Sequence, residues 1–413
     1  MKLRLLSLGL FIPRVLGWGA AGHDIIATIA QIHLHPSVLP VICDILNYTS
    51  TNPDEPPCRL APVSTWADRF KYRMRWSAPL HYVGAKDDYP SETCWAGSRN
   101  INVLAGIMNV ISLLDAWVEG SSSDDTAEEA LKFLIHFVGD LHMPLHLTGR
   151  DRGGNSVKTN LYSAWDGLLI AKTLRNIPRK YDHPLPIPSL ERNLRGAIYD
   201  GFIRQIMWEG ILHDWKDQVP EWLVCPSEKA APPPSSLPKG YKYLPSIIYD
   251  YVTQYWGYIS STFASSSAST DDSTVCPHFW AQPIHAMNCD FVWPKALDEP
   301  PYNHIRAFGS DSDPLTPRPK LPLFALDTPE YWGYIAENHI LHKLMAQGCI
   351  QLAGILNWLF ADLAEAGVDA HRMQRSTFLL FGGLHIELCF EFLLEFCGSF
   401  SASCYESESA NRE

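Results

Sequence analysis

Residues 130–146 read ALKFLIHFVGDLHMPLH, and this run decides both the fold class and the chemistry expected of the chain. Apolar residues recur at spacings of three and four through Ala130–Val138, which is typical of a buried helix. His136 and Asp140 are four residues apart and therefore share one helical face. Pro144 closes the helix near its end, which lets His146 approach from the following turn. Because zinc takes imidazole nitrogen and carboxylate oxygen as ligands, the run predicts a zinc site built on a helix.

The density of polar groups in this apolar run is more informative than any one of them. A single histidine in an apolar helix is usually a core or surface residue, whereas residues 136–146 hold three histidines and an aspartate. A buried carboxylate beside imidazoles costs on the order of several kcal/mol unless it is paired or bound to a metal. If the role of this aspartate were purely structural, its carboxylate would therefore need another partner to compensate for burial.

The rest of the chain predicts an all-α fold. Helical spacing of apolar residues appears again at Asn102–Trp117 and Tyr334–Leu363, and strand-like alternation is scarce. We expect a signal peptide at residues 1–17, one catalytic domain at 18–363, and a tail at 364–413 to which the sequence assigns no role. Stretches rich in proline and serine near 226–238 and 260–274 predict loop insertions in that domain. Charged residues within 378–400 argue against a membrane span there.

The charge balance limits how this protein can hold a polyanion. The 413 residues are 46% apolar and carry 33 Lys plus Arg against 45 Asp plus Glu, a net charge of −12. A broad basic surface for nucleic acid needs many cations and is not expected here. A phosphate substrate would have to be neutralised locally, for which bound metal ions are the obvious means.

The N-terminus and the cysteines favour a secreted protein. Lys2 and Arg4 precede an apolar stretch, Leu5–Ile12, and Val15–Gly17 resembles a cleavage region, although Pro13 and Arg14 interrupt the pattern. The chain has ten cysteines, which suit an oxidising compartment, and a glycosylation sequon at Asn47. Cys43 with Cys58 and Cys225 with Cys276 are expected pairs because they lie near each other in the chain.

Further candidate residues are spread through the first half of the chain. Each could be structural when taken singly. In chain order they are His23 in Trp18-Gly19-Ala20-Ala21-Gly22-His23, Asp68 in Trp66-Ala67-Asp68 with Lys71 following, His81 in Leu80-His81-Tyr82, Asn155 in Gly153-Gly154-Asn155, and Asp166 in Trp165-Asp166.

In this order the motifs resemble the zinc-dependent single-strand nucleases of fungi and plants, the mung bean nuclease type. That family shares its fold with bacterial zinc phospholipase C. The resemblance covers residues 18–175 closely and continues more loosely to Cys289 and the helix ending near Phe360. It implies a secreted, monomeric endonuclease that hydrolyses single-stranded DNA and RNA, with 3′-nucleotidase activity, nucleotides as further substrates and no membrane partner.

The resemblance also implies which residues bind zinc. Family members begin at a Trp whose α-amino nitrogen and carbonyl oxygen bind the metal, so cleavage after Gly17 would make Trp18 a ligand beside His23. Three zinc ions are expected in all. One would be held by Asp68, His81, His136 and Asp140, one by Trp18, His23 and the bridging Asp140, and one by His146 and Asp166. Lys71 and Asn155 match positions that contact the scissile phosphate, and Cys94 with Cys289 match a family disulfide.

The sequence departs from the family pattern in three places. The His expected four residues before Asp166 is Tyr162, and a neutral phenol is a poor zinc ligand, so we expect a weakened third site. The stretch 155–160 is shorter than the family pattern, and a carboxylate expected three residues after His81 is Gly84. Two other functions therefore stay open: a zinc phospholipase C, and a secreted member of the fold that binds zinc poorly and has lost catalysis.

Overall fold

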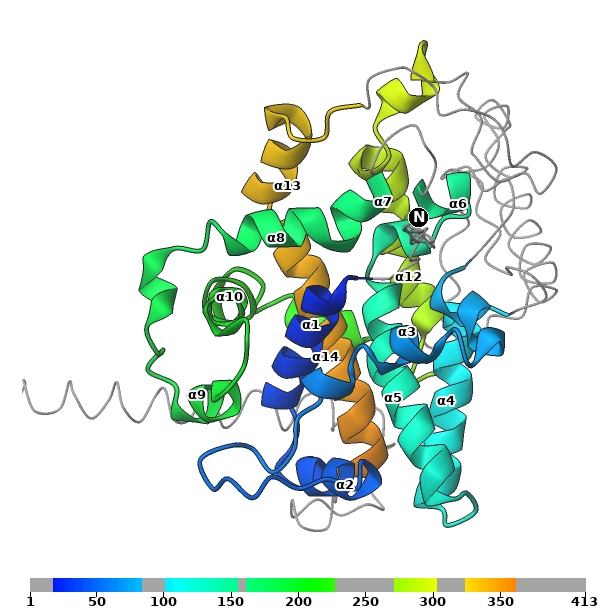
Figure 1. The fold of residues 1–413 in the computed structure, drawn as a ribbon, viewed down its shortest axis with the longest axis vertical. Coiled ribbons are helices and arrows are strands. Elements are labelled where there is room, and N and C mark those ends of the chain that lie inside the picture. The colour runs from blue at the N-terminus through cyan, green and yellow to red at the C-terminus, as the bar shows by residue number, and fades with distance from the viewer. Residues whose placement is uncertain (1–17, 84–100, 155–160, 227–270, 303–323, 362–413) are drawn as a thin grey trace, which may run out of the picture.

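The computed structural model describes residues 18–83, 101–154, 161–226, 271–302 and 324–361, which form helices and contain no β-strand. The all-α prediction is confirmed (Figure 1). The longer helices are α1 (Ala20–Ile32), α2 (Val38–Ile45), α4 (Val103–Val118), α5 (Asp124–Leu141), α12 (Pro277–Met287) and α14 (Ile340–Phe360). Shorter helices and single turns are α3 (Trp66–Phe70), η1 (Ala61–Val63), η2 (Arg75–His81), η3 (Pro144–His146), α6 (Asp151–Gly154), α7 (Leu161–Ser163), η4 (Ala164–Leu168), α8 (Leu169–Leu174), η5 (Arg179–Asp182), α9 (Pro188–Leu194), α10 (Asp200–Gln205), η6 (Ile206–Asp214), η7 (Val219–Leu223), η9 (Asn288–Val292), η10 (Lys295–Asp298), η12 (Pro329–Gly333) and α13 (Tyr334–Glu337).

Helix α5 carries the run from which the fold was predicted. Ser123 caps its N-terminus by accepting a hydrogen bond from the backbone N–H of Thr126 at 3.3 Å, and Asp124 and Asp125 lie in the first turn, where the helix dipole favours negative charge. The helix ends at Leu141, and Pro144 then begins the turn η3 that carries His146. The prediction that proline would separate His146 from the helix is confirmed.

Helix α14 runs through the middle of the helical assembly, with α1 packed against it and the pair α4 and α5 beside it (Figure 1). Nearly every residue of α14 is buried, which explains why its sequence is mostly apolar. The buried apolar residues of the described ranges form one cluster, which includes both Trp18 and Phe360. Helix α5 contacts both α1 and α14, so the face that carries His136 and Asp140 is fixed from several directions.

The helical character expected at Tyr334–Leu363 is confirmed, but it is divided into two helices. His339 adopts a left-handed backbone conformation with φ of 50°, and it lies between the end of α13 and the start of α14. The predicted insertions at 226–238 and 260–274 lie almost entirely outside the described residues, as does the tail at 364–413.

Two disulfides tie surface segments to this core. Cys43 pairs with Cys58 and Cys225 with Cys276, as expected from their proximity in the chain. Cys94 lies outside the described residues, so its pairing with Cys289 stays a prediction. Within the described ranges, no helix has both the length and the apolar character that crossing a bilayer requires.

Asn357 gives a test of how α14 is anchored. Its buried amide accepts a hydrogen bond from the N–H of His35 at 2.8 Å and donates one to the carbonyl of His33 at 3.0 Å. We expect Asn357→Ala to lower the free energy of unfolding by about 2–4 kcal/mol, because two backbone groups lose their partner in a buried place. Urea unfolding followed by circular dichroism measures the change. The matched control is Asn338→Ala, whose amide donates to the Tyr334 carbonyl on the surface, and an equal loss in both variants would contradict the argument.

Candidate metal centre

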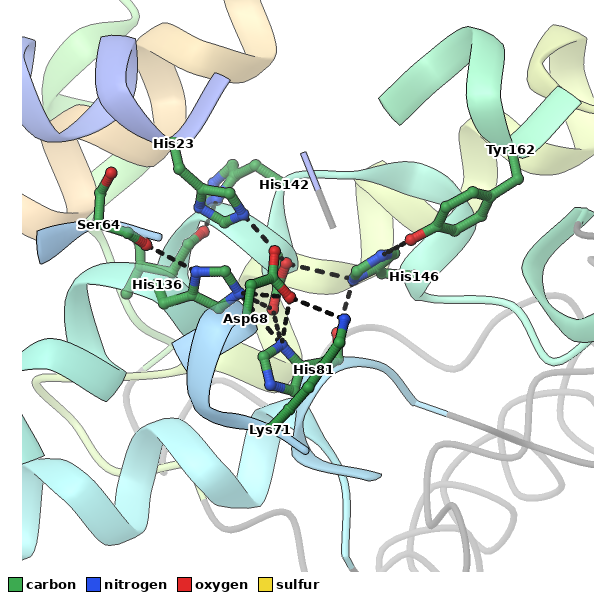
Figure 2. Close-up of polar contacts among 11 residues, drawn as sticks. His23, Ser64, Asp68, Lys71, His81, His136, His142, His146 and Tyr162 are labelled. Carbon is green, nitrogen blue, oxygen red and sulfur yellow. Dashed lines mark hydrogen bonds and ion pairs between the residues drawn. The ribbon is translucent and has the colours of Figure 1, made fainter. Parts of the chain in front are cut away.

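Four elements that are distant in sequence bring histidine and aspartate side chains to one buried point. His136 and Asp140 come from α5, His23 from α1, Asp68 from α3 and His81 from the end of η2. All five side chains are at most 7% exposed. Figure 2 shows the three histidines and Asp68 pointing toward one another.

The ligand atoms of this cluster are as close together as a shared metal requires. Oδ2 of Asp140 lies 2.9 Å from Nδ1 of His81 and 3.2 Å from Nε2 of His136. Oδ1 of Asp68 lies 3.7 Å from Nε2 of His136 and 3.9 Å from Nδ1 of His81. Ligands about 2.1 Å from a tetrahedral zinc are separated from one another by roughly 3.4 Å. The trio His81, His136 and Asp140 and the trio His23, Asp68 and His136 each have their ligand atoms within 4.8 Å of one another.

Backbone carbonyls fix which ring nitrogens face the cluster. Nδ1 of His136 donates to the Ser64 carbonyl at 2.7 Å, and Nδ1 of His146 donates to the His81 carbonyl at 2.6 Å. Each ring therefore carries its proton on Nδ1 when neutral and offers the lone pair of Nε2. Outer hydrogen bonds of this kind are how proteins orient metal-binding histidines.

His23 enters the cluster through a gap that glycine leaves in α5. Its ring stacks on His136 with centroids 4.0 Å apart, and its Nε2 lies 3.4 Å from Oδ1 of Asp140. A Cβ placed on Gly139 would lie only 2.5 Å from Nδ1 of His23. The absence of a side chain at this one position on α5 is what admits the His23 ring.

The electrostatics show how strongly this cluster favours a cation. Burial raises the pKa of Asp140, but the neighbouring His136 and His146 outweigh it and hold the pKa well below its usual range. Burial lowers the pKa of His136, but Asp140 and Asp68 outweigh it and raise the pKa to about 9. Burial, with a further contribution from His136, lowers the pKa of His23 to about 4, so this ring is neutral and able to bind a metal.

The donor set fits zinc, and unpartnered atoms mark where ligands would bind. Nε2 of His23 and Oδ1 of Asp140 lie 3.4 Å apart, and both are buried without a hydrogen-bond partner. Buried polar groups in folded proteins are nearly always satisfied, so two such atoms facing each other indicate room for a bound species. Imidazole and carboxylate are the donor types that zinc prefers.

The region expected to form the third site is arranged differently. Nε2 of His146 accepts a hydrogen bond from the Tyr162 hydroxyl at 3.0 Å, so the phenol occupies the side of the ring on which a third ligand was expected (Figure 2). Burial, then the carboxylates of Asp68 and Asp140, raise the pKa of Asp166 to about 8, and its Oδ1 is buried without a partner. Oδ1 of Asp166 therefore has no hydrogen-bond partner, whereas Nε2 of His146, the other residue expected in the third site, already has one.

Of the remaining predicted residues, Lys71 and Trp18 lie within the described part of the chain. Lys71 lies beside the cluster, with its ammonium 3.0 Å from Oδ1 of Asp68. The side chain of Trp18 is fully buried against Gly22, and the next residue, Gly19, donates its N–H to the Asp166 carbonyl at 2.6 Å. This bond joins the start of α1 to the segment of Asp166. Asn155 lies outside the described residues.

Similarity to known proteins agrees with this geometry. The family model described as S1/P1 Nuclease matches residues 18–223. Endonuclease 2 of Arabidopsis thaliana is 30% identical over 238 residues, which are 53% of this chain and 73% of the relative. The chain belongs to the S1/P1 nuclease family. Nuclease S1 of Aspergillus oryzae is 35% identical over 165 residues, 36% of this chain and 53% of the relative. Nuclease P1 of Penicillium citrinum is 30% identical over 173 residues, 38% of this chain and 60% of the relative.

Family membership gives the general chemistry and leaves the finer assignments open. The chain is a member of a family of nucleases, which favours this activity over the phospholipase alternative. The matched residues include the whole cluster from His23 to Asp166. The individual metal ligands and the zinc ions themselves stay predictions.

Sequence reasoning overestimated one residue and missed two others. His142 counted toward the density of the run, yet its Nδ1 donates to the Val138 carbonyl and its ring packs against Gly348 of α14, away from the cluster. Ser64 was missed because it acts through its backbone carbonyl. Gly139 was missed although a glycine inside an apolar helix, directly before Asp140, is a signal of close packing.

Gly139→Ala tests whether the gap in α5 positions His23. Alanine favours a helix over glycine by about 1 kcal/mol, but here its Cβ would displace the His23 ring. We expect zinc content after dialysis to fall by about one ion per chain, because a catalytic zinc site normally needs three protein ligands. Gly333→Ala is the control, since the nearest atom to its Cβ would be 3.8 Å away. Unchanged zinc content in Gly139→Ala would show that His23 is not held in this way.

Proposed function

We propose that this family member is a zinc-dependent endonuclease that hydrolyses phosphodiester bonds of single-stranded DNA and RNA and also has 3′-nucleotidase activity. The observation that carries the proposal is the buried cluster of His23, Asp68, His81, His136 and Asp140, with its unpartnered ligand atoms, in a chain of a nuclease family. We propose further that the protein is a secreted monomer, which its two disulfides support as far as the compartment is concerned.

The proposed ligand sets are those that the family resemblance implies. Asp68, His81, His136 and Asp140 would hold one zinc, and a second would be held by His23, Asp140 and the terminal amino group of a processed Trp18. His146 and Asp166 would hold a third. When bound, zinc supplies Lewis acidity that activates water and offsets the charge that develops on the phosphate.

Lys71 is the residue of this chain best placed to bind the scissile phosphate. Its ammonium lies next to Asp68 with the side chain 10% exposed, so it is a cation held at the edge of the cluster. A fixed cation contacts a phosphate without first having to be ordered, and it neutralises charge that an acidic chain otherwise cannot. Asp68 keeps Lys71 in place while it also faces the metal. Asn155 is proposed as a second phosphate contact.

Zinc content and single-strand cleavage together test the function. We expect dialysed protein to hold two zinc ions per chain. With added zinc it should cut single-stranded DNA much faster than duplex DNA, and it should lose this cleavage on chelation. His136→Ala removes a ligand shared by both trios of the cluster and should lower the rate at least 100-fold, the scale of a lost catalytic group.

The control for that test is His183→Ala, which alters an exposed histidine and should leave both readouts unchanged. Chains that hold one zinc or none and show no cleavage would support the alternative of a degenerate member of the fold. Cleavage that survives complete removal of metal would contradict the proposed mechanism.

Tyr162→His tests the third site separately. The phenol now bonds to Nε2 of His146, and an imidazole in its place would offer a nitrogen ligand beside Asp166. We expect wild type to cleave weakly and to require added zinc, and the variant to reach half-maximal rate at a lower zinc concentration with a higher rate at saturation. The measurement is zinc-titrated cleavage of single-stranded DNA at equal protein concentration. Tyr162→Phe is the control, because it frees His146 without adding a ligand, and coincident curves for wild type and Tyr162→His would show that Tyr162 does not limit this protein.

A further inference from the structure

The segment Arg69–Trp76, which reads RFKYRMRW, alternates basic residues with aromatic or apolar ones. It carries four cations and no carboxylate, in a chain whose net charge is −12. The segment begins directly after Asp68 and leads into η2, which ends at His81. A positively charged segment of an acidic chain therefore lies in sequence between Asp68 and His81, two of the proposed zinc ligands.

Trp76 presents an aromatic surface to solvent at this place. Its side chain is 58% exposed, although exposure of such a large apolar group is costly. The ring rests against Phe133 of α5, with centroids 5.6 Å apart. Phe133 stacks on Phe137 at 5.1 Å, and Phe137 meets the ring of His81 edge-on at 5.4 Å. A row of aromatic rings thus leads from the metal cluster to the surface and ends at Trp76.

The cations beside Trp76 are available to an external anion. Arg73 and Arg75 are exposed, and within the described part of the chain neither has a carboxylate partner. The guanidinium of Arg73 lies over the ring of Phe70, 5.6 Å from its centroid, which holds it near the surface of α3. By contrast, Arg204 is committed to Glu191 at 2.8 Å and to Asp200 at 2.7 Å.

We infer that residues 69–76 bind the strand outside the metal cluster, with a nucleobase stacked on Trp76 and the adjoining phosphates on Arg73 and Arg75. Exposed aromatic rings between cations are how proteins hold single strands without reading sequence, because every base has a face to stack. Bases inside a duplex are already stacked on one another, so this surface selects unpaired strands. The inference rests on the proposed function and names the part of the chain that would give it strand selectivity.

Strand binding to zinc-loaded protein tests the inference with two probes. One is a fluorescein-labelled strand of twelve thymidines with phosphorothioate linkages, which slow cleavage, and the other is the matching strand of abasic sites. Trp76→Ala should weaken binding of the thymidine strand about 5- to 150-fold, the range that a stacked base contributes, and leave binding of the abasic strand nearly unchanged. Arg75→Ala should weaken both strands, and it should reduce the salt dependence of binding. Fluorescence anisotropy measures each affinity.

Controls separate stacking from damage to the fold. Trp76→Phe keeps a face for stacking and should recover most of the affinity, and Phe279→Ala removes an aromatic side chain that is 41% exposed on α12 and should change nothing. Zinc content and thermal unfolding should match wild type in all variants.

The outcomes distinguish this inference from the proposed function. Wild-type protein that binds the thymidine strand through Trp76 but does not cleave single strands would leave the inference standing and remove the function. The inference is overturned if Trp76→Ala binds thymidines as wild type does, if it loses both strands equally, or if wild type binds no strand at all.

Discussion

The structure depends on one constraint, the burial of the Asp140 carboxylate in the middle of an apolar helix. No part of its side chain is exposed. Its oxygen atoms lie 2.9 Å from a ring nitrogen of His81 and 3.2 Å from one of His136, which are hydrogen-bond distances. The ring nitrogens of His23 and His146 are slightly further away, at 3.4 and 3.5 Å. An isolated charge in such a place is very unfavourable, so the fold must bring polar partners to it from other elements. The arrangement of α1, η2 and η3 around α5 places the imidazoles of His23, His81 and His146 beside it.

Backbone groups carry much of the precision of this arrangement. Carbonyls of Ser64 and His81 set the rings of His136 and His146, and glycines at 19 and 139 permit approaches that any Cβ would block. The groups that orient these rings are backbone carbonyls and glycine backbone, and no further side chain is needed to do so. Metal sites generally depend on such surroundings as much as on the ligands themselves.

Local charge, and not net charge, determines what this acidic chain can bind. The candidate metal centre brings its own carboxylates together, while Lys71 and the basic segment after Asp68 place cations beside it. These cations attract an anion locally, although the net charge of the chain is −12. At one edge of the same cluster, the Tyr162 hydroxyl bonds to His146.

The sequence by itself determined the all-α class, the helix with His136 and Asp140 on one face, the turn made by Pro144, and the disulfide between Cys43 and Cys58, which are 15 residues apart. Each of these depends on spacing along a single element or on short separations in the chain, where periodicity and proximity act directly. Only the tertiary structure decided that His142 turns away, that His339 breaks the last helix, that His23 enters over Gly139 and that Tyr162 caps His146. Those features depend on contacts between backbone groups and side chains of elements that are far apart in sequence, and such contacts cannot be predicted from a local sequence pattern.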